Sequence, residues 1–331
     1  MPDVESPARS APEVHLTTLV AFCSTLRTRL QTHSAVRICV IFNPTAKGDK
    51  ARRFRRHLAE IGADATLRQT RGPNHASALA AEAVREGFDL IVAAGGDGTL
   101  NEVLNGITGE PAGCERTRLG VLPLGTVNVF ARELRLPLGL RASWETIRRG
   151  REQKIDLPCV EFAGAQGKAI RYFSQLAGAG LDARAVELVD WNAKKMIGYL
   201  AYVLAGLRAL RQAPAKITVK TGHGELMGET VLLGNGRLYG GNFRVFPEAG
   251  LGDGLLDVCV FPQMRWGTLF WCTPSAMVLG TLPARAVRRV QVATVTLHSA
   301  ASVPLQVDGE LVGHLPATFS VARQALRVVV P

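Results

Sequence analysis

Short apolar runs alternate with stretches of helical spacing along the chain from Arg37 to Leu122. Four of the apolar runs predict strands, over residues 37–42, 65–70, 89–94 and 119–122. Residues 47–61 and 75–87 have the spacing of helices, and a third helix is expected after the glycine-rich turn at residue 95. Such alternation predicts a parallel sheet covered by helices on both faces. Ligands of these sheets bind beyond the carboxyl ends of the strands, so functional residues are expected there.

The sequence beyond about Leu157 is of a different kind, because strand-like runs follow one another with a single predicted helix, over 193–210. The runs cover residues 158–162, 169–176, 216–220, 255–261, 289–298 and 326–330. We therefore expect an antiparallel, β-rich second domain. Three parts are predicted: an appendage over 1–34, an α/β domain over 35–156 that the C-terminal strand 317–331 can complete, and the β-rich domain over 157–316. The interdomain cleft is the expected active site.

Length, charge and cysteine content limit the class of protein. The 331 residues exceed what one hydrophobic core usually serves, which favours two domains. Lys and Arg number 39 against 28 Asp and Glu, and this excess favours anionic partners such as nucleotides, nucleic acid or acidic lipid. The basic clusters lack aromatic stacking residues, so we expect no nucleic-acid partner. Six scattered cysteines without a C-x-x-C pair argue against a zinc site or a disulfide framework and favour a reducing compartment.

Three segments bear on contact with a membrane. The stretch from Leu16 to Leu30 has the spacing of an amphipathic helix, which either packs against protein or lies on a membrane surface. The apolar stretch 196–207 is too short to span a bilayer, and the stretch 266–284 contains two prolines. We therefore interpret 266–284 as a buried or interfacial helix. The N-terminal residues show no evident signal peptide, and a cytoplasmic protein is expected.

The strongest local signal is a glycine-rich turn in which Gly95, Gly96 and Gly98 surround Asp97. The turn lies between an apolar run and a predicted helix. Glycines allow close approach of the backbone, and amide groups at a helix N-terminus favour a bound phosphate. Asp97 would then face the ligand, as a metal or phosphate-network residue. A tight strand-to-helix turn with a capping aspartate is the alternative reading of the same residues.

A second turn of this type follows the strand predicted over 119–122. Gly125 and Thr126 can offer an amide and a hydroxyl to a phosphate or a ribose, and Asn128 can cap the helix or orient the turn. Alone it is also a plausible helix cap. Two such turns after neighbouring strands of one sheet indicate a nucleotide site.

Six motifs in order give the chain its resemblance to a known family. They are Phe42 to Gly48, Gly95 to Thr99, Leu124 to Thr126 with Asn128, Gly234 to Gly236 followed by Gly240 and Gly241, Asp253 to Val258, and Asp308 to Glu310. From Arg37 to Val330 the chain resembles the catalytic domain shared by soluble bacterial diacylglycerol kinases, sphingosine kinases and ceramide kinases. The resemblance implies an ATP-dependent lipid kinase that phosphorylates a lipid hydroxyl, with diacylglycerol as the first expected substrate. The β-rich domain would then be the lipid-substrate domain.

The resemblance also implies roles for individual residues. It places the nucleotide site at Asn43, Thr70, Gly95, Gly96, Asp97, Gly98, Thr99, Leu100, Asn101, Glu102, Gly125 and Thr126. It implies a structural Mg²⁺ site at Asp253 with the backbone carbonyls of Gly250 and Leu255. Glu310 would be the proton acceptor, with Asp308 beside it and near enough to substitute in part. A lipid hydroxyl is a poor nucleophile, so a carboxylate that accepts its proton would assist the transfer. We expect Glu310 to lie across the cleft from the two glycine turns.

One departure and several alternatives accompany this interpretation. Val129 stands where many bacterial relatives have an Asp, which puts the usual polar network near the phosphates in doubt. The acceptor could instead be a sphingoid base, ceramide or phosphatidylglycerol. An NAD kinase-like enzyme and a catalytically idle lipid or nucleotide sensor are the other readings. We further expect peripheral contact with an anionic membrane surface, and a homodimer is a further possibility.

Overall fold

The computed structural model describes residues 36–44, 49–164, 167–188, 206, 208–211, 213–268, 272, 275, 282–283 and 285–331. Residues 37–331 form one compact unit, which is the second unit of the chain and carries every described element. The predicted N-terminal helix, most of the predicted helix over 193–210, and most of 266–284 lie outside the described residues. Within the described part of the chain, no helix is long and apolar enough to cross a membrane.

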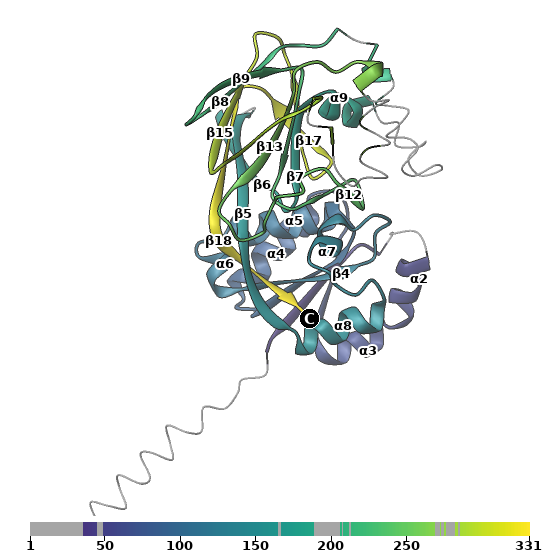
Figure 1. Ribbon diagram of the computed structural model, residues 1–331. Coiled ribbons are helices and arrows are strands. Elements are labelled where there is room, and N and C mark those ends of the chain that lie inside the picture. Colours follow the sequence, from purple (N-terminus) through teal and green to yellow (C-terminus); the bar gives the residue numbers. More distant parts are fainter. Residues whose placement is uncertain are drawn as a thin grey trace, which may run out of the picture. The chain divides into compact units, whose positions relative to one another are not determined.

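A parallel sheet forms the first half of the second unit (Figure 1). Its strands are β1 (Ile38–Phe42), β2 (Thr66–Gln69), β3 (Leu90–Gly95) and β4 (Arg118–Pro123). They are hydrogen-bonded in the order β2-β1-β3-β4, and every pair is parallel. The chain leaves β1 toward one side for β2 and returns to the other side for β3. The switch point between β1 and β3 is where open α/β sheets bind their ligands.

Seven helices of this half are described. They are α2 (Asp49–Arg56), α3 (Leu58–Asp64), α4 (His75–Arg85), α5 (Asp97–Thr108), α6 (Gly113–Arg116), α7 (Val129–Glu133) and α8 (Leu140–Arg149). The single helix predicted over 47–61 was wrong, because α2 ends at Arg56 and α3 begins after His57. Both faces of the sheet are covered, since alternate residues of β1 pack on opposite sides. Ile41 lies in the core with α4 and α5, whereas Val40 lies in the core with α2, α3 and α8.

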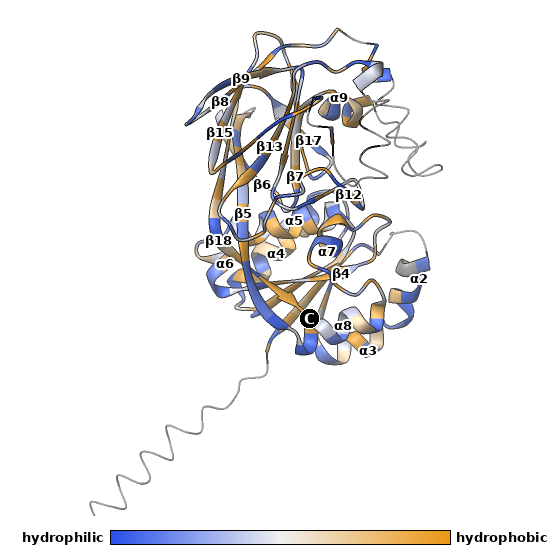
Figure 2. Cartoon of the chain, viewed as in Figure 1, coloured by the Kyte–Doolittle hydropathy of each residue, from blue (hydrophilic) through white to orange (hydrophobic). Residues whose placement is uncertain are grey.

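Figure 2 shows the consequence of burial on both faces: the strands of the parallel sheet are apolar along most of their length, while the outer surfaces of the helices are polar. All five residues of β1 and all six of β3 are buried. Continuous apolar runs are typical of such strands.

Two long strands connect this sheet to the second half. The strands β5 (Arg151–Gly164) and β18 (Ala317–Val330) pair antiparallel over their length, and Val328 of β18 pairs in parallel with Leu119 of β4. A bulge interrupts the pairing between Ala322 and Leu326. The buried Asp156 side chain fixes this bulge, because its Oδ1 accepts from the Gln324 amide N–H over 2.7 Å.

The second half consists of two antiparallel sheets. The first sheet continues from β18 through β15 (Thr294–His298), β8 (Ile217–Thr221) and β9 (Gly224–Gly228), with β6 (Gly167–Tyr172) beside β5. The other has the order β14 (Arg288–Val292), β13 (Leu256–Phe261), β10 (Thr230–Gly234), β7 (Leu176–Gly180), β16 (Pro304–Val307), β17 (Glu310–His314). The helix α9 (Leu181–Leu188) and the hairpin of β11 (Leu238–Tyr239) and β12 (Phe243–Arg244) complete it. The predicted fold class, an α/β half followed by an antiparallel β-rich half, is confirmed.

Two strand predictions in this half were wrong in detail. The run over 169–176 is not one strand but β6 and β7, which belong to different sheets because the chain turns at Phe173 to Gln175. The run over 289–298 is divided in the same way into β14 and β15. The strands β9, β10, β16 and β17 were not predicted. The inner faces of the two sheets share one core, in which the rings of Phe173 and Phe319 meet edge to face at 6.3 Å.

Candidate active site

Four of the predicted site residues lie at the carboxyl ends of the four parallel strands. Asn43 follows β1, Thr70 follows β2, Gly96 follows β3, and Gly125 lies shortly after β4. The Thr70 amide N–H donates to the carbonyl of Phe42 over 2.8 Å, which holds the ends of β1 and β2 together. The structure therefore brings these residues to one edge of the sheet, next to its switch point.

The two glycine turns are packed backbone against backbone. The amide N–H groups of Leu124 and Gly125 donate to the Gly95 carbonyl over 2.9 and 3.2 Å. A Cβ added to Gly125 would lie 2.5 Å from the Cα of Gly96. Asn128 closes the second turn, since its Oδ1 accepts from the Gly125 amide over 3.0 Å and its Nδ2 donates to the Gly125 carbonyl over 2.7 Å. Only glycines fit here, and the Gly125 amide is used within the turn, because it donates to the Gly95 carbonyl and to Asn128 Oδ1.

Asp97 joins the two turns. It is the first residue of α5, and its carboxylate accepts from the Phe130 amide N–H over 3.4 Å at the start of α7. Burial raises the pKa of Asp97, hydrogen bonds from the Val129 and Phe130 amides oppose this rise, and the charge of Asp308 adds to it. Val129 takes part in this contact through its backbone amide. The role of Asp97 toward a metal or a phosphate stays a prediction.

Three further residues predicted for the nucleotide site, Leu100, Asn101 and Glu102, follow along α5. Leu100 is buried in the core, and Asn101 is fully buried. Glu102 accepts from the Ala76 amide N–H over 3.0 Å and so caps the first turn of α4. Successive residues of a helix point in directions about 100° apart, so these three side chains have different surroundings. The assignment of Gly95 to Glu102 to the nucleotide site stays a prediction.

Asp308 lies in the turn before β17, where five donors surround its carboxylate. Oδ1 accepts from the amide N–H groups of Gln175 and Leu176, each over 3.0 Å. Oδ2 accepts from the amide and the hydroxyl of Ser174, over 2.7 and 2.9 Å, and from Asn101 Nδ2 over 2.9 Å. A carboxylate has about four lone-pair positions, so these are filled. Asp308 is a positioning residue, and the expectation that it could replace the neighbouring glutamate as base is corrected.

Glu310, the first residue of β17, lies beside the glycine-rich turn. A Cβ added to Gly98 would lie 3.1 Å from Glu310 Oε1. The other oxygen, Oε2, lies 3.5 Å from Nη2 of Arg171 on β6. The expectation that Glu310 faces the glycine turns across a cleft was wrong, since the carboxylate is next to the first turn of α5. The positive end of the helix and the guanidinium both attract the carboxylate to this position.

Several residues of this site were missed in the sequence. Asn105 of α5 donates from Nδ2 to the Tyr172 carbonyl over 2.9 Å and accepts the Tyr172 amide N–H over 3.0 Å. Gln175 donates to Glu133 Oε2 over 3.0 Å and so connects β7 with α7. Two asparagines four residues apart on an otherwise apolar helix face, Asn101 and Asn105, are a signal that could have indicated this contact. Nothing local in the sequence indicated Arg171.

The predicted Mg²⁺ site is a turn before β13. Asp253 Oδ1 accepts from the Leu255 amide N–H over 2.9 Å. The Asp156 carboxylate also fixes this turn, because it accepts from the Gly254 amide N–H over 2.6 Å. Burial raises the pKa of the nearby Asp257, a hydrogen bond from Gln291 lowers it, and the charges of Asp253 and Glu248 raise it further. In the described part of the chain, no three His, Cys, Asp or Glu side chains are close enough to hold a metal. The Asp253 carboxylate and nearby backbone carbonyls, surrounded by the negative charges of Glu248 and Asp257, still suit a hard cation such as Mg²⁺.

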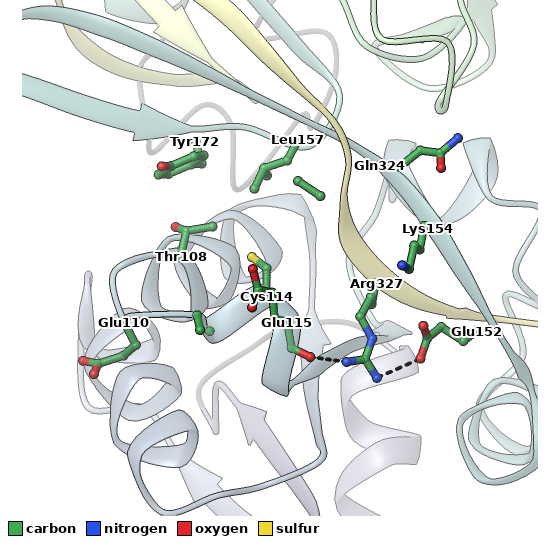
Figure 3. Close-up of a pocket in the computed structure, with 13 residues that line it drawn as sticks. Thr108, Glu110, Cys114, Glu115, Glu152, Lys154, Leu157, Tyr172, Gln324 and Arg327 are labelled. Carbon is green, nitrogen blue, oxygen red and sulfur yellow. Dashed lines mark hydrogen bonds and ion pairs between the residues drawn. The ribbon is translucent and has the colours of Figure 1, made fainter.

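A separate pocket of about 650 Å³ lies at the opposite end of α5 from the glycine-rich turn. Figure 3 shows Tyr172 and Leu157 on one side of it and Thr108 and Cys114 on the other. Arg327 lies in its wall, ion-paired with Glu152 over 2.9 Å. None of the predicted site residues lines this pocket. It is therefore distinct from the site at the sheet edge.

Comparison with known proteins identifies the family. Residues 37–160 match the diacylglycerol kinase catalytic domain, and residues 175–330 match the YegS C-terminal NAD kinase beta sandwich-like domain. A diacylglycerol kinase of Bacillus subtilis (strain 168) is 31% identical over 306 residues, with 88% of this chain and 95% of that protein covered. A diacylglycerol kinase of Staphylococcus carnosus (strain TM300) is 29% identical over 303 residues, with 88% of this chain and 94% of that protein covered.

Solved structures share the fold. A diacylglycerol kinase from Bacillus anthracis str. Sterne superposes with a TM-score of 0.65 at 18% identity, over 89% of this chain and 97% of that chain. Yeast NADH kinase complexed with NADH superposes with a TM-score of 0.52 at 11% identity, over 90% of this chain and 84% of that chain. At these identities the likeness concerns the fold alone. Taken with the matches in sequence, which confirm the resemblance of the six motifs, it follows that the chain belongs to the diacylglycerol kinase catalytic domain family and is a kinase.

Proposed function

We propose that the protein transfers the γ-phosphoryl group of ATP to the hydroxyl of a lipid, with diacylglycerol as the first candidate and phosphatidic acid as its product. The observation that carries this proposal is the position of Glu310 beside Gly98, at the N-terminal turn of α5. A carboxylate in this place is next to the amides that suit a phosphate. It can accept a proton from a hydroxyl that attacks there.

In this proposal, some residues bind the nucleotide and others position the groups that take part in the transfer. Backbone amides of the glycine-rich turn at the start of α5 bind the phosphates, and Asn43, Thr70 and Thr126 border the nucleotide at the same sheet edge. ATP supplies the phosphoryl group. Asp97 keeps the two turns together, and Asp308 fixes the turn that presents Glu310. Phosphoryl transfer depends mainly on alignment and on neutralising charge, which such fixed backbone groups provide.

A structural Mg²⁺ bound by Asp253 and the carbonyls of Gly250 and Leu255 is part of the proposal. The cation would neutralise the carboxylates that raise the pKa of Asp257 and stiffen the turn before β13. The Asp156 side chain joins this turn to the bulge in β18. Metal binding there would stabilise the junction of the two halves.

Contact with an anionic membrane is proposed on the basis of the surface charge. The exposed residues Arg52, Arg53 and Arg56 lie on α2, whose buried face is formed by Ala51 and Phe54. Each cation near an anionic surface contributes on the order of 1 kcal/mol. We expect peripheral, salt-sensitive association on the cytoplasmic side.

Radiolabelled ATP and a panel of acceptors test the function. The panel contains diacylglycerol, sphingosine, ceramide and phosphatidylglycerol in mixed micelles, together with soluble NAD. We expect label in phosphatidic acid with the wild type and a loss of label with Glu310→Gln. Label in NAD without label in any lipid would identify an NAD kinase-like enzyme, and no label in any acceptor would favour a sensor.

A further inference from the structure

Arg171 is the cation next to the proposed base, and the two come from different sheets. Arg171 lies on β6, which pairs with β5, whereas Glu310 begins β17, which pairs with β16. Nη2 of the arginine is 3.5 Å from Oε2 of the glutamate, and the two side chains are 23% and 39% exposed. The pair is therefore partly shielded from water, where a charge interaction is stronger than at an open surface.

Both members of the pair are fixed to α5 through two of its asparagines, the buried Asn101 and the half-buried Asn105. Tyr172, directly after Arg171, exchanges two hydrogen bonds with the side chain of Asn105, over 2.9 and 3.0 Å. Asn101 donates to the Tyr172 carbonyl over 3.2 Å and to Asp308 Oδ2 over 2.9 Å, two residues before Glu310. The helix that begins at the glycine-rich turn thus sets the position of the arginine and of the glutamate relative to that turn.

The fold itself gives little reason for an arginine at this position. Its Nε is buried and, among the described residues, has no hydrogen-bond partner. A buried donor without a partner costs about 1–3 kcal/mol. An apolar residue would avoid that cost, so the described contact that accounts for the guanidinium is the one with Glu310.

We infer that Arg171 is a positioning residue for Glu310, whose Oε1 it holds against the first turn of α5. This inference rests on the proposed role of Glu310 as base. The arginine acts on the orientation of the base and not on the binding of either substrate. Its loss should therefore lower kcat and leave KM for ATP and for lipid nearly unchanged. A displacement of a reacting group by about 1 Å can lower a rate by about 10²-fold.

The kinetic experiment uses Arg171→Gln and Arg171→Met as the neutral variants and Arg171→Lys as the conservative one. Lys168→Gln is the matched control, because Lys168 lies on the same strand and forms an exposed ion pair with Glu161 over 2.6 Å. We expect both neutral variants to lose about 10- to 100-fold in kcat, Arg171→Lys to recover most of this, and Lys168→Gln to match the wild type. In a Glu310→Gln background, Arg171→Gln should cause no further loss.

Three kinetic results would overturn the inference: unchanged kcat in the neutral variants, a rise in KM at constant kcat, or the same fold-loss with and without Glu310. A structural readout separates this inference from the proposed function. Crystal structures of the wild type and Arg171→Met show whether Glu310 Oε1 moves away from Gly98 by more than about 1 Å. A glutamate that stays in place contradicts the inference even in an active enzyme. One that moves supports it even when no lipid is turned over, a result that would refute only the proposed function.

Discussion

The side-chain amide of Asn101 donates to the Asp308 carboxylate over 2.9 Å and thereby joins α5 to the turn before β17. The residues are 207 positions apart in the chain. Through this contact, the helix that carries the glycine-rich turn and the strand that carries Glu310 share one buried hydrogen-bond network. The fold therefore sets the distance between the glycine-rich turn and Glu310. The two halves of the unit do not have to move toward each other to bring them together.

Asp308→Asn should destabilise the protein by at least about 2 kcal/mol, because an amide has one acceptor oxygen and leaves buried N–H groups without a partner. Urea unfolding followed by circular dichroism measures the change. Glu310→Gln serves as the control and should alter the free energy of unfolding by no more than about 0.5 kcal/mol. An Asp308→Asn variant as stable as the wild type would contradict the positioning role of Asp308.

Glu310→Gln should lower kcat by about 10²–10⁴, because glutamine keeps the size of the side chain but cannot accept the proton. ATP binding should be maintained or strengthened, since the substitution removes a negative charge next to the glycine-rich turn. Steady-state kinetics and calorimetric titration with a non-hydrolysable ATP analogue measure the two effects. Weaker nucleotide binding at an unchanged kcat would assign the residue to the nucleotide site instead.

Gly125→Ala should separate the two glycine turns, because its Cβ would meet the Gly96 Cα at 2.5 Å and Asn128 Oδ1 at 2.8 Å. Overpacking of this kind costs about 1–3 kcal/mol, and nucleotide binding should weaken as the two turns move apart. Gly139→Ala is the matched control, since a Cβ there meets no atom within 4 Å. Thermal unfolding and the same calorimetric titration compare the two variants. Equal behaviour of both would show that the contact between the turns is unimportant.

Asp97 should make the stability of the protein depend on pH. The pKa of Asp97 is raised in the folded state, because burial disfavours the charged carboxylate. The contribution of this group to the free energy of unfolding is therefore fully present below about pH 4, the ordinary range of an aspartate, and is lost as the pH rises through the raised pKa. Asp97→Asn lacks this titration. The melting temperature of the wild type minus that of Asp97→Asn should therefore fall as the pH rises from about 4 toward neutrality. A difference that stays constant or increases would contradict the raised pKa.

Mg²⁺ should raise the melting temperature of the wild type and have less effect on Asp253→Asn, in which the charged ligand is lost. At ten times its dissociation constant, a ligand that binds only the folded state adds about 1.4 kcal/mol. Differential scanning fluorimetry with Mg²⁺ and after addition of EDTA measures the shift without any need for activity. A Mg²⁺-dependent shift of equal size in both proteins would place the metal elsewhere.

The sequence by itself determined the four parallel strands, the glycine turns after β3 and β4, and the change to antiparallel strands beyond Leu157. These features are local: periodicity depends on neighbouring residues, and a glycine at the end of an apolar run already implies a close approach of the backbone. The family could be named for the same reason, because its motifs are short and keep their order.

Only the tertiary structure decided which side chains lie beside the glycine-rich turn. Asn101 is buried on α5 and binds Asp308, and the other hydrogen bonds that fill the Asp308 carboxylate also come from segments far away in the sequence. The proximity of Glu310 to Gly98 and to Arg171 follows from the pairing of β17 with β16 and of β6 with β5. Contacts between distant strands depend on the register of whole sheets, which no single segment of the sequence encodes.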